Sequence, residues 1–183
     1  MEYRLRTPLS AADINCLRSG DVVYLDGTIY TARDKAHIRI CKEGSPVSLM
    51  GSVLYHCGPL IQDNRVLSAG PTTSGRLSRY TEEILNLGVK AIIGKGGLPR
   101  KSFEGRAIYL SYPGGCGAVA ASQLFIRNIY FAELGMAEAI WEFMAANMGP
   151  MIVAIDSHGC DLYDDVRKNV QKRLRSRFDV QTC

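Results

Sequence analysis

Short apolar runs that end in glycine-rich turns alternate with helix-length patterns along the chain. Asp21–Thr31 places two β-rich runs around Asp26-Gly27, a dipeptide that permits positive φ in a tight turn, so this segment predicts a hairpin. Asp34–Lys42 predicts a helix, with Asp34 in its first turn and Gly44 closing it. The first quarter of the chain therefore indicates a mixture of α and β structure.

Further strands are predicted where apolar residues run together before a turn. These runs are Val53–Cys57, Val89–Ile93, Ala107–Tyr112 and Met151–Ile155. Between the first two, apolar residues at three- and four-residue steps predict a helix that Gly88 ends: Leu77, Tyr80, Ile84 and Leu87. Phe125–Phe143 is dense enough in apolar residues for a helix or for strands, and we favour strands around Gly135.

The last predicted helix combines an apolar stripe with a change of charge. Its apolar residues recur every four positions and predict an inner stripe: Leu162, Val166, Val170 and Leu174. Acidic residues (Asp161, Asp164, Asp165) precede six basic ones (Arg167, Lys168, Lys172, Arg173, Arg175, Arg177). This order complements the helix dipole, so we expect a solvated helix, and binding of nucleic acid by the basic run is the weaker alternative.

Composition is that of a soluble globular protein: 183 residues, 46% hydrophobic, 22% charged and a formal net charge of +4. We expect a single α/β domain over residues 1–183. Apolar stretches fall short of the roughly 18 to 20 residues that cross a bilayer, and Met1–Ser10 has no apolar core behind its charges, so we expect a cytoplasmic protein. The six cysteines form no C-x-x-C pair, which favours reduced thiols and no metal site built by this chain alone.

Three glycine-rich turns, at 70–75, 94–97 and 114–117, follow apolar or extended segments and could let backbone N–H groups approach an anion. Arg33, Arg76 and Lys95 each lie at a loop or helix start of the kind that gathers on one rim of an α/β sheet, where converging cations would bind a dianion. From the residues alone, ordinary turns and unrelated surface charges remain the alternative. A P-loop and a dinucleotide-binding fingerprint are both missing from the sequence.

Seven short motifs join rare residue types to predicted loops. In chain order they are T-A-R-D-K-A-H (31–37), Y-H-C-G-P (55–59), G-P-T-T-S-G-R (70–76), I-G-K-G-G (93–97), Y-P-G-G-C-G-A (112–118), L-G-M-A-E-A-I-W (134–141) and I-D-S-H-G (155–159). Together they resemble the β subunit of iron-sulfur hydro-lyases, the family of class I fumarase and L(+)-tartrate dehydratase. The resemblance spans about Gly20 to Tyr163.

The resemblance implies a swivelling β/β/α three-layer domain that pairs with an α subunit. That partner would hold a [4Fe-4S] cluster whose open iron acts as a Lewis acid on the substrate hydroxyl, while a protein group removes the proton from the neighbouring carbon. Ser74, where similar loops often have alanine, and Cys116 are departures from the pattern, and neither removes a charged group.

Carried over motif by motif, the resemblance also implies roles for five residues. Arg33, Arg76 and Lys95 would bind the two substrate carboxylates. His37 would lie near the substrate. Thr72 would be the catalytic base, provided that nearby cations stabilise its alkoxide.

We therefore expect the β subunit of a class I fumarate hydratase, which interconverts (S)-malate and fumarate only as a hetero-oligomer with its cluster-bearing α subunit. The β subunit of L(+)-tartrate dehydratase is a close alternative, because the two dicarboxylate substrates differ by one hydroxyl, and a mesaconate-type substrate is also open. A non-catalytic small-anion-binding module is the alternative from another class. It would keep the loops without the reaction.

Overall fold

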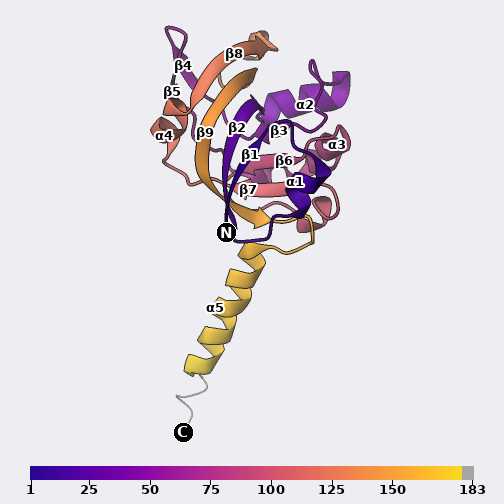
Figure 1. The fold of residues 1–183 in the computed structure, drawn as a ribbon, viewed down its shortest axis with the longest axis vertical. Helices are drawn as coiled ribbons and strands as arrows, with labels where there is room; N and C mark the ends of the chain where they lie inside the picture. The colour runs from indigo at the N-terminus through magenta and orange to yellow at the C-terminus, as the bar shows by residue number, and fades with distance from the viewer. Residues whose placement is uncertain (179–183) are drawn as a thin grey trace.

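Five strands pair in a ring at the centre of the molecule. They are β2 (Val22–Thr31), β3 (Val53–Tyr55), β6 (Ala91–Gly94), β7 (Ile108–Ser111) and β9 (Ile140–Ile155). In this computed structural model, which describes residues 1–178, β2, β3, β6 and β7 are parallel neighbours in that order. β9 pairs antiparallel with β7 and also with β2, which closes the ring. Figure 1 shows β9 curving across the domain to make both pairings.

The remaining elements surround this ring. β1 (Glu2–Arg6) extends it beside β2, and β8 (Leu124–Tyr130) extends it beside β9. β4 (Leu60–Gln62) and β5 (Arg65–Ser68) form a separate hairpin. The helices are α1 (Ala11–Asn15), α2 (Asp34–Glu43), α3 (Thr81–Asn86), α4 (Gly117–Ser122) and α5 (Leu162–Phe178), with 3₁₀ helices η1 (Ser74–Tyr80), η2 (Arg100–Ser102) and η3 (Ala132–Leu134).

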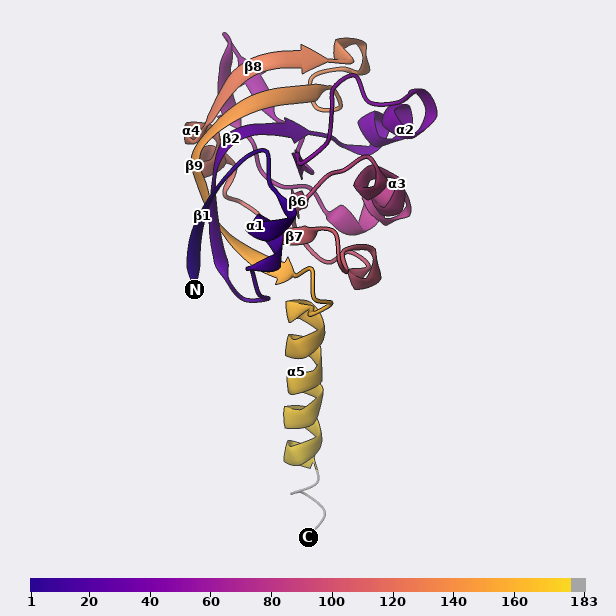
Figure 2. The ribbon, with the colours of Figure 1, turned by 45° about the vertical axis from the view of Figure 1, so that its right-hand side comes forward.

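Alternate residues of the ring strands belong to two separate hydrophobic clusters. Val53 and Tyr55 of β3 belong to the cluster that all five ring strands share, as do Ala91 and Ile93 of β6. The residues between them, such as Leu54 and Ile92, pack with Ala36 and Ile40 of α2 and with Ile84 and Leu85 of α3. This two-residue alternation places one core inside the ring and a second core under α2 and α3, which lie together on one side in Figure 2.

The structure confirms the predicted mixture of α and β structure, and it shows a closed ring of strands that the sequence patterns did not indicate. The predicted strands correspond to β3, β6, β7, β8 and β9, and the predicted helix after Arg33 is α2, which Gly44 caps with a positive φ of 89°. The pattern that predicted one helix up to Gly88 contains two elements, η1 and α3.

The predicted hairpin at Asp26-Gly27 is wrong. β2 runs straight through it as one strand of 10 residues. Gly27 does adopt a positive φ of 99°, and the register with β9 shifts there, but the conformation serves a bulge rather than a turn. Thr7 lies where a Gly27 Cβ would be, so the chain leaving β1 packs against β2 at this point. The tight turn with two left-handed residues is instead Asp63-Asn64, between β4 and β5.

α5 is the helix that the sequence predicts, but its stripe does not face inward. Asp161 caps the helix by accepting hydrogen bonds from the backbone N–H groups of Tyr163 and Asp164, and the helix then leaves the domain (Figure 1). Val166, Val170 and Leu174 are 54%, 49% and 50% exposed, so the prediction of an inner stripe is wrong. Among residues 1–178, no helix has the length and hydrophobicity that crossing a bilayer requires.

Candidate active site

The ends of three neighbouring parallel strands bring together the loops that carry the predicted residues. Arg33 follows β2, His56 follows β3, and Lys95 follows β6. Because parallel strands end at the same edge of a sheet, these three loops lie side by side. The loop with Thr72 comes from elsewhere, since it follows the β4–β5 hairpin.

Backbone hydrogen bonds fix the Thr72 loop between the ends of β3 and β6. Thr72 N donates to the carbonyl of His56 at 2.7 Å, and Lys95 N donates to the carbonyl of Thr72 at 3.3 Å. Ser74 N returns a bond of 3.0 Å to the carbonyl of Lys95. The loop therefore continues the ladder of the ring, and its side chains share the positions of strand-end residues.

Arg76 contacts Thr72 directly. Its Nη2 donates a hydrogen bond to Thr72 Oγ1 at 2.7 Å, and the same atom lies 3.8 Å from Asp34 Oδ2. The Arg76 side chain is 54% exposed, so the Asp34 ion pair is weak and the remaining donors face solvent. A guanidinium bound to a hydroxyl oxygen favours the ionised form of that hydroxyl, and its free donors can bind a carboxylate.

Arg33 lies over Gly58, on the neighbouring strand-end loop. A Cβ at Gly58 would be 2.6 Å from Arg33 Cδ and 2.8 Å from its Nη1, so only glycine leaves room for this side chain. Arg33 Nε is 3.6 Å from Glu138 Oε1, but it is buried and has no hydrogen-bond partner among the residues described. Arg33 is thus a partly buried cation whose donors are not all used by the protein.

Two neutral imidazoles lie behind these cations. His37 Nδ1 bonds the carbonyl of Arg33 at 2.8 Å, and its ring lies edge-on to His56 with 5.0 Å between centroids. Burial lowers the pKa of His37 to about 4 and that of His56 well below the usual value. His37 is therefore a neutral group that bonds the backbone carbonyl of Arg33, the N-cap of α2, and it adds no charge to the site.

His56 belongs to a buried chain of hydroxyl groups. Its Nδ1 is 2.8 Å from Ser74 Oγ, which accepts a hydrogen bond of 3.0 Å from the hydroxyl of Tyr109. Ser74 and Tyr109 also occupy the space where a Gly94 side chain would project, which is why the turn before Lys95 needs glycine. This chain ties the Thr72 loop to β3 and β7.

All three glycine-rich turns meet here. Gly70 lies against Gly117: a Cβ at Gly70 would be 3.5 Å from Gly117 Cα, and Ala69 N donates to the carbonyl of Gly117 at 3.0 Å. The Lys95 side chain runs past Gly114, where a Cβ would be 3.8 Å from its Nζ. The turns thus pack on one another and leave the lysine ammonium beside the backbone of the third turn.

The five predicted residues therefore come from adjoining loops, with Thr72, Arg76 and Lys95 in one hydrogen-bonded unit and Arg33 and His37 at the start of α2. Sequence reasoning missed Glu138 and Tyr109, and it assigned His56 no role in the site. The motif Y-H-C-G-P already marked His56, but its link to Tyr109 crosses long stretches of sequence and leaves no local signal.

The described residues around these side chains form no set of metal ligands. Among residues 1–178, no three His, Cys, Asp or Glu side chains come close enough to hold a metal ion. Cys57 is buried in the hydrophobic core, and Cys116 packs against the same core. The donors that residues 1–178 offer by themselves do not fit an iron-sulfur cluster.

Comparison with known proteins gives one consistent result. The family model described as Fumarase C-terminus matches residues 1–166. A protein of Methanocaldococcus jannaschii assigned as an L(+)-tartrate dehydratase β subunit is 44% identical, and the match covers 95% of this chain and 97% of that relative. The L(+)-tartrate dehydratase β subunit of Escherichia coli strain K12 is 37% identical, over 94% and 92% of the two chains.

A longer protein is related at lower identity. A protein of Geobacillus stearothermophilus assigned as a class I fumarate hydratase is 34% identical over 93% of this chain, which corresponds to 35% of that relative. The predicted family is confirmed, and so is the prediction of a hydro-lyase subunit. The chain belongs to the Fumarase C-terminus family, together with the L(+)-tartrate dehydratase β subunits and with part of the longer class I fumarate hydratase relative.

Proposed function

We propose that the chain is the β subunit of an L(+)-tartrate dehydratase. The expectation from sequence favoured fumarate hydratase, but the relatives of higher identity carry the tartrate name and the fumarate name occurs at 34%. Dehydration of tartrate removes a hydroxyl from one carbon and a proton from the next, and the resulting enol becomes a keto dicarboxylate. The chain would act with an α subunit, as the names of its relatives as β subunits suggest.

The observation that carries the proposal is the contact of Arg76 with Thr72. A threonine hydroxyl is a poor base at neutral pH, and a charge-assisted hydrogen bond to its oxygen stabilises the alkoxide. Lys95, on the loop that bonds the Thr72 backbone, adds a second positive charge nearby. Thr72 would accept the proton from the substrate carbon.

The same two cations would hold the substrate together with Arg33. Arg33, Arg76 and Lys95 offer donors to two carboxylates, and the two arginines can bind them through paired N–H groups. The buried imidazoles of His37 and His56 carry no charge that would compete for the substrate. Binding two carboxylates fixes the orientation of the intervening carbons relative to Thr72.

The [4Fe-4S] cluster belongs to the α subunit in this proposal, because the donors in the described part of this chain do not fit it. The finer predictions of a β/β/α domain that swivels against the α subunit, and of a cytoplasmic location, belong to the same proposal. This chain supplies the cationic wall of the site and the base.

The function can be tested by anaerobic co-expression of this chain with an α subunit, followed by a comparison of kcat/KM for different substrates. We expect kcat/KM for L(+)-tartrate to exceed that for (S)-malate and mesaconate by at least about tenfold, because a site that binds a second hydroxyl discriminates against substrates that lack it. A preference for (S)-malate would establish a fumarate hydratase instead. Turnover by this chain alone would contradict the division of roles between the subunits.

A further inference from the structure

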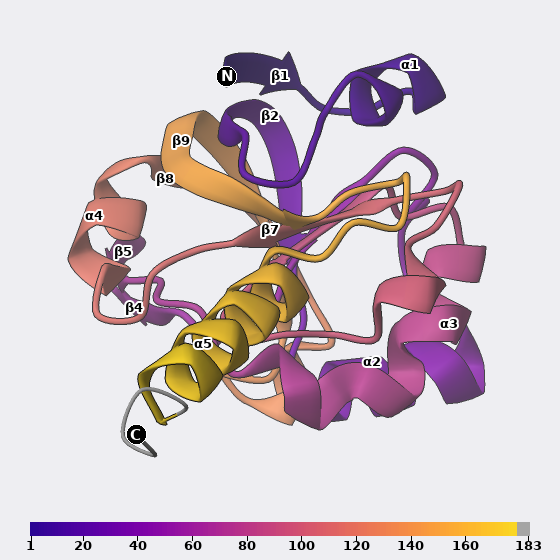
Figure 3. The same cartoon turned by 90° about the horizontal axis from the view of Figure 1, so that it is seen from below.

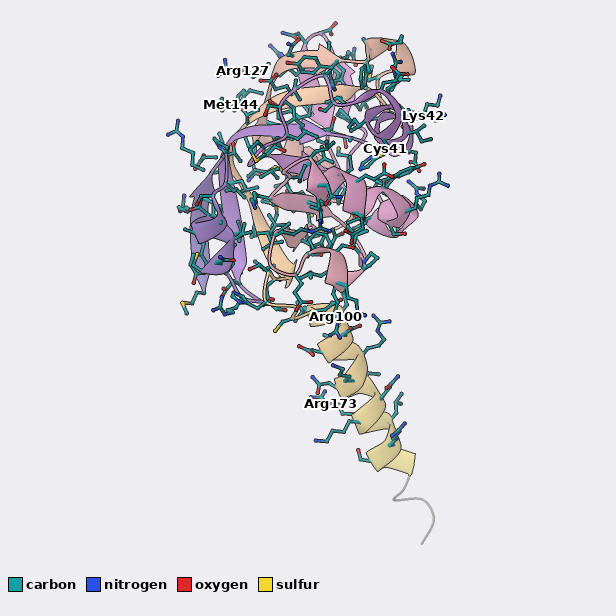
Figure 4. The ribbon with its side chains drawn as sticks, turned by 90° about the vertical axis from the view of Figure 1, so that its right-hand side faces the viewer. Cys41, Lys42, Arg100, Arg127, Met144 and Arg173 are labelled. Atoms are coloured by element: carbon teal, nitrogen blue, oxygen red, sulfur yellow. The ribbon has the colours of Figure 1, made fainter. Side chains whose placement is uncertain are left out.

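α5 presents an apolar stripe that nothing in residues 1–178 covers. Val166, Val170 and Leu174 follow one another at four-residue steps on one side of the helix, and each is about half exposed. The helix extends away from the domain in Figures 1, 2 and 4 and meets it at its first turn. Single exposed aliphatic residues are ordinary, but a stripe of three along a projecting helix is typical of a binding surface.

A helix of 17 residues in water is only marginally stable by itself. Most helices of this length in proteins are stabilised by packing one apolar face. α5 has the apolar face but no surface of its own chain against it among the residues described, so binding of a partner would supply the missing packing.

The charge of α5 restricts what that partner can be. The helix carries six of the 22 basic residues and two of the 18 acidic ones, so its net charge of +4 equals that of the whole chain and the remainder is neutral. Arg167 and Arg173 border the stripe on either side. A complementary surface is therefore an apolar groove with acidic residues along its rim.

The first turn of α5 also contacts the candidate active site. The hydroxyl of Tyr163 is 2.8 Å from Ser111 Oγ, at the end of β7, and its ring lies 3.7 Å from where a Gly97 Cβ would be. Gly97 is in the same loop as Lys95. In Figure 3, which views the molecule from below, α5 lies in front of the domain. Figure 4 labels Arg100 near the first turn of α5 and Arg173 further out on the helix.

We propose that α5 is the docking helix for the α subunit, which binds its Val166–Val170–Leu174 stripe in an apolar groove with an acidic rim. The inference rests on the proposed function, which requires such a partner. A protein seated along α5 reaches the loop of Lys95 at the first turn of the helix, so docking and completion of the active site occur on one continuous surface.

Two other occupants fit the observations less well. A pair of α5 helices packed stripe to stripe would bring together two helices that each carry a net charge of +4, so like charges would repel. A lipid surface suits the basic residues, but the stripe consists of two valines and one leucine without the aromatic residues that anchor interfacial helices.

The test measures the affinity of the full-length chain for the purified α subunit of the same enzyme by calorimetry. The stripe variant carries Val166→Gln, Val170→Gln and Leu174→Gln, and glutamine preserves helix propensity. We expect Kd to rise about 100-fold or more. The matched control, Lys168→Gln with Lys172→Gln on the opposite side of the helix, is expected to stay within about threefold. Because α5 leaves the domain, both variants should unfold at the wild-type temperature.

The outcomes separate the docking inference from the proposed function. Wild type and stripe variant binding the α subunit equally well would overturn the inference and leave the function intact, whereas no binding by wild type would overturn both. A dimer in sedimentation that the stripe variant abolishes would assign the stripe to a second copy. Flotation of wild type, but not of the variant, with phosphatidylcholine–phosphatidylglycerol vesicles would assign it to a lipid surface.

Discussion

Arg76 Nη2 donates a hydrogen bond of 2.7 Å to Thr72 Oγ1, so the candidate cation and the candidate base are in direct contact. The two residues are four positions apart, at the end of a loop and in the first turn of η1. The loop backbone is fixed on both sides, to His56 and to Lys95. The contact is therefore set by the fold and does not depend on substrate to form.

Replacing Arg76 should impair the proposed reaction. We expect Arg76→Ala to lower kcat/KM of the reconstituted enzyme by about 100-fold or more, because it removes a carboxylate donor and the group that stabilises the Thr72 alkoxide. Arg79→Ala is the matched control, since Arg79 lies on the same 3₁₀ helix and stacks on Tyr80. Equal rates for the two variants would remove Arg76 from the site.

The hydroxyl of Thr72 can be tested against that of its neighbour. Thr72→Val keeps the size of the side chain and removes the oxygen, so turnover should fall by about 1000-fold if Thr72 is the base, while Thr72→Ser should retain activity within about tenfold. Thr73→Val changes an exposed hydroxyl in the same loop and should leave kcat unchanged. Steady-state assays of the three variants decide the role, and full activity of Thr72→Val would exclude it.

The buried imidazoles predict a loss of stability in acid. The pKa of His37 is about 4 in the folded chain and about 6.5 when unfolded, so below pH 6.5 the unfolded state binds a proton that the folded state does not. The free energy of unfolding should therefore fall between pH 6.5 and 4, by up to about 1.4 kcal/mol per pH unit for this group. His56, whose pKa is also lowered by burial, acts in the same direction.

Urea unfolding between about pH 7 and pH 4.5 measures this loss. His37→Asn retains a donor for the carbonyl of Arg33 and does not titrate, so its stability should depend less steeply on pH than that of wild type. Equal slopes for the two proteins would show that folding does not shift the pKa of His37.

Gly58 provides a way to move Arg33 without removing it. A methyl group there would lie 2.6 Å from both Arg33 Cδ and the carbonyl oxygen of Ala137, so Gly58→Ala should displace the guanidinium and raise KM by about tenfold or more. Gly105→Ala is the control, because Gly105 has a φ of +73° but open space around it, and it tests backbone strain alone. A KM of wild-type size in Gly58→Ala would place Arg33 outside the binding site.

Local patterns predicted much of this structure. Runs such as Val89–Ile93 and the helix after Arg33 depend on neighbouring residues, and they appear as expected. The roles of Thr72 and Arg76 came from the resemblance of short motifs, and the structure adds the contact between their side chains. Those roles themselves stay predictions until the variants are measured.

The errors have physical causes in distant contacts. Asp26-Gly27 has the composition of a turn, but Thr7 and β9 pack against it and hold the strand through a bulge. The stripe of α5 has the spacing of a buried face, and periodicity does not tell whether the surface that buries it lies in the same chain. The bond from Tyr109 to Ser74 likewise joins residues far apart in sequence.

The pairing of β9 with β2 has a consequence for how the chain acquires its structure. Residues 22–30 meet residues 142–152, so the last segment of the ring must arrive before the first can complete its hydrogen bonds. During synthesis, β2 leaves the ribosome with one edge open and stays so until β9 follows. Contacts of such long sequence separation slow folding, and the nascent chain must avoid edge-to-edge aggregation in that interval.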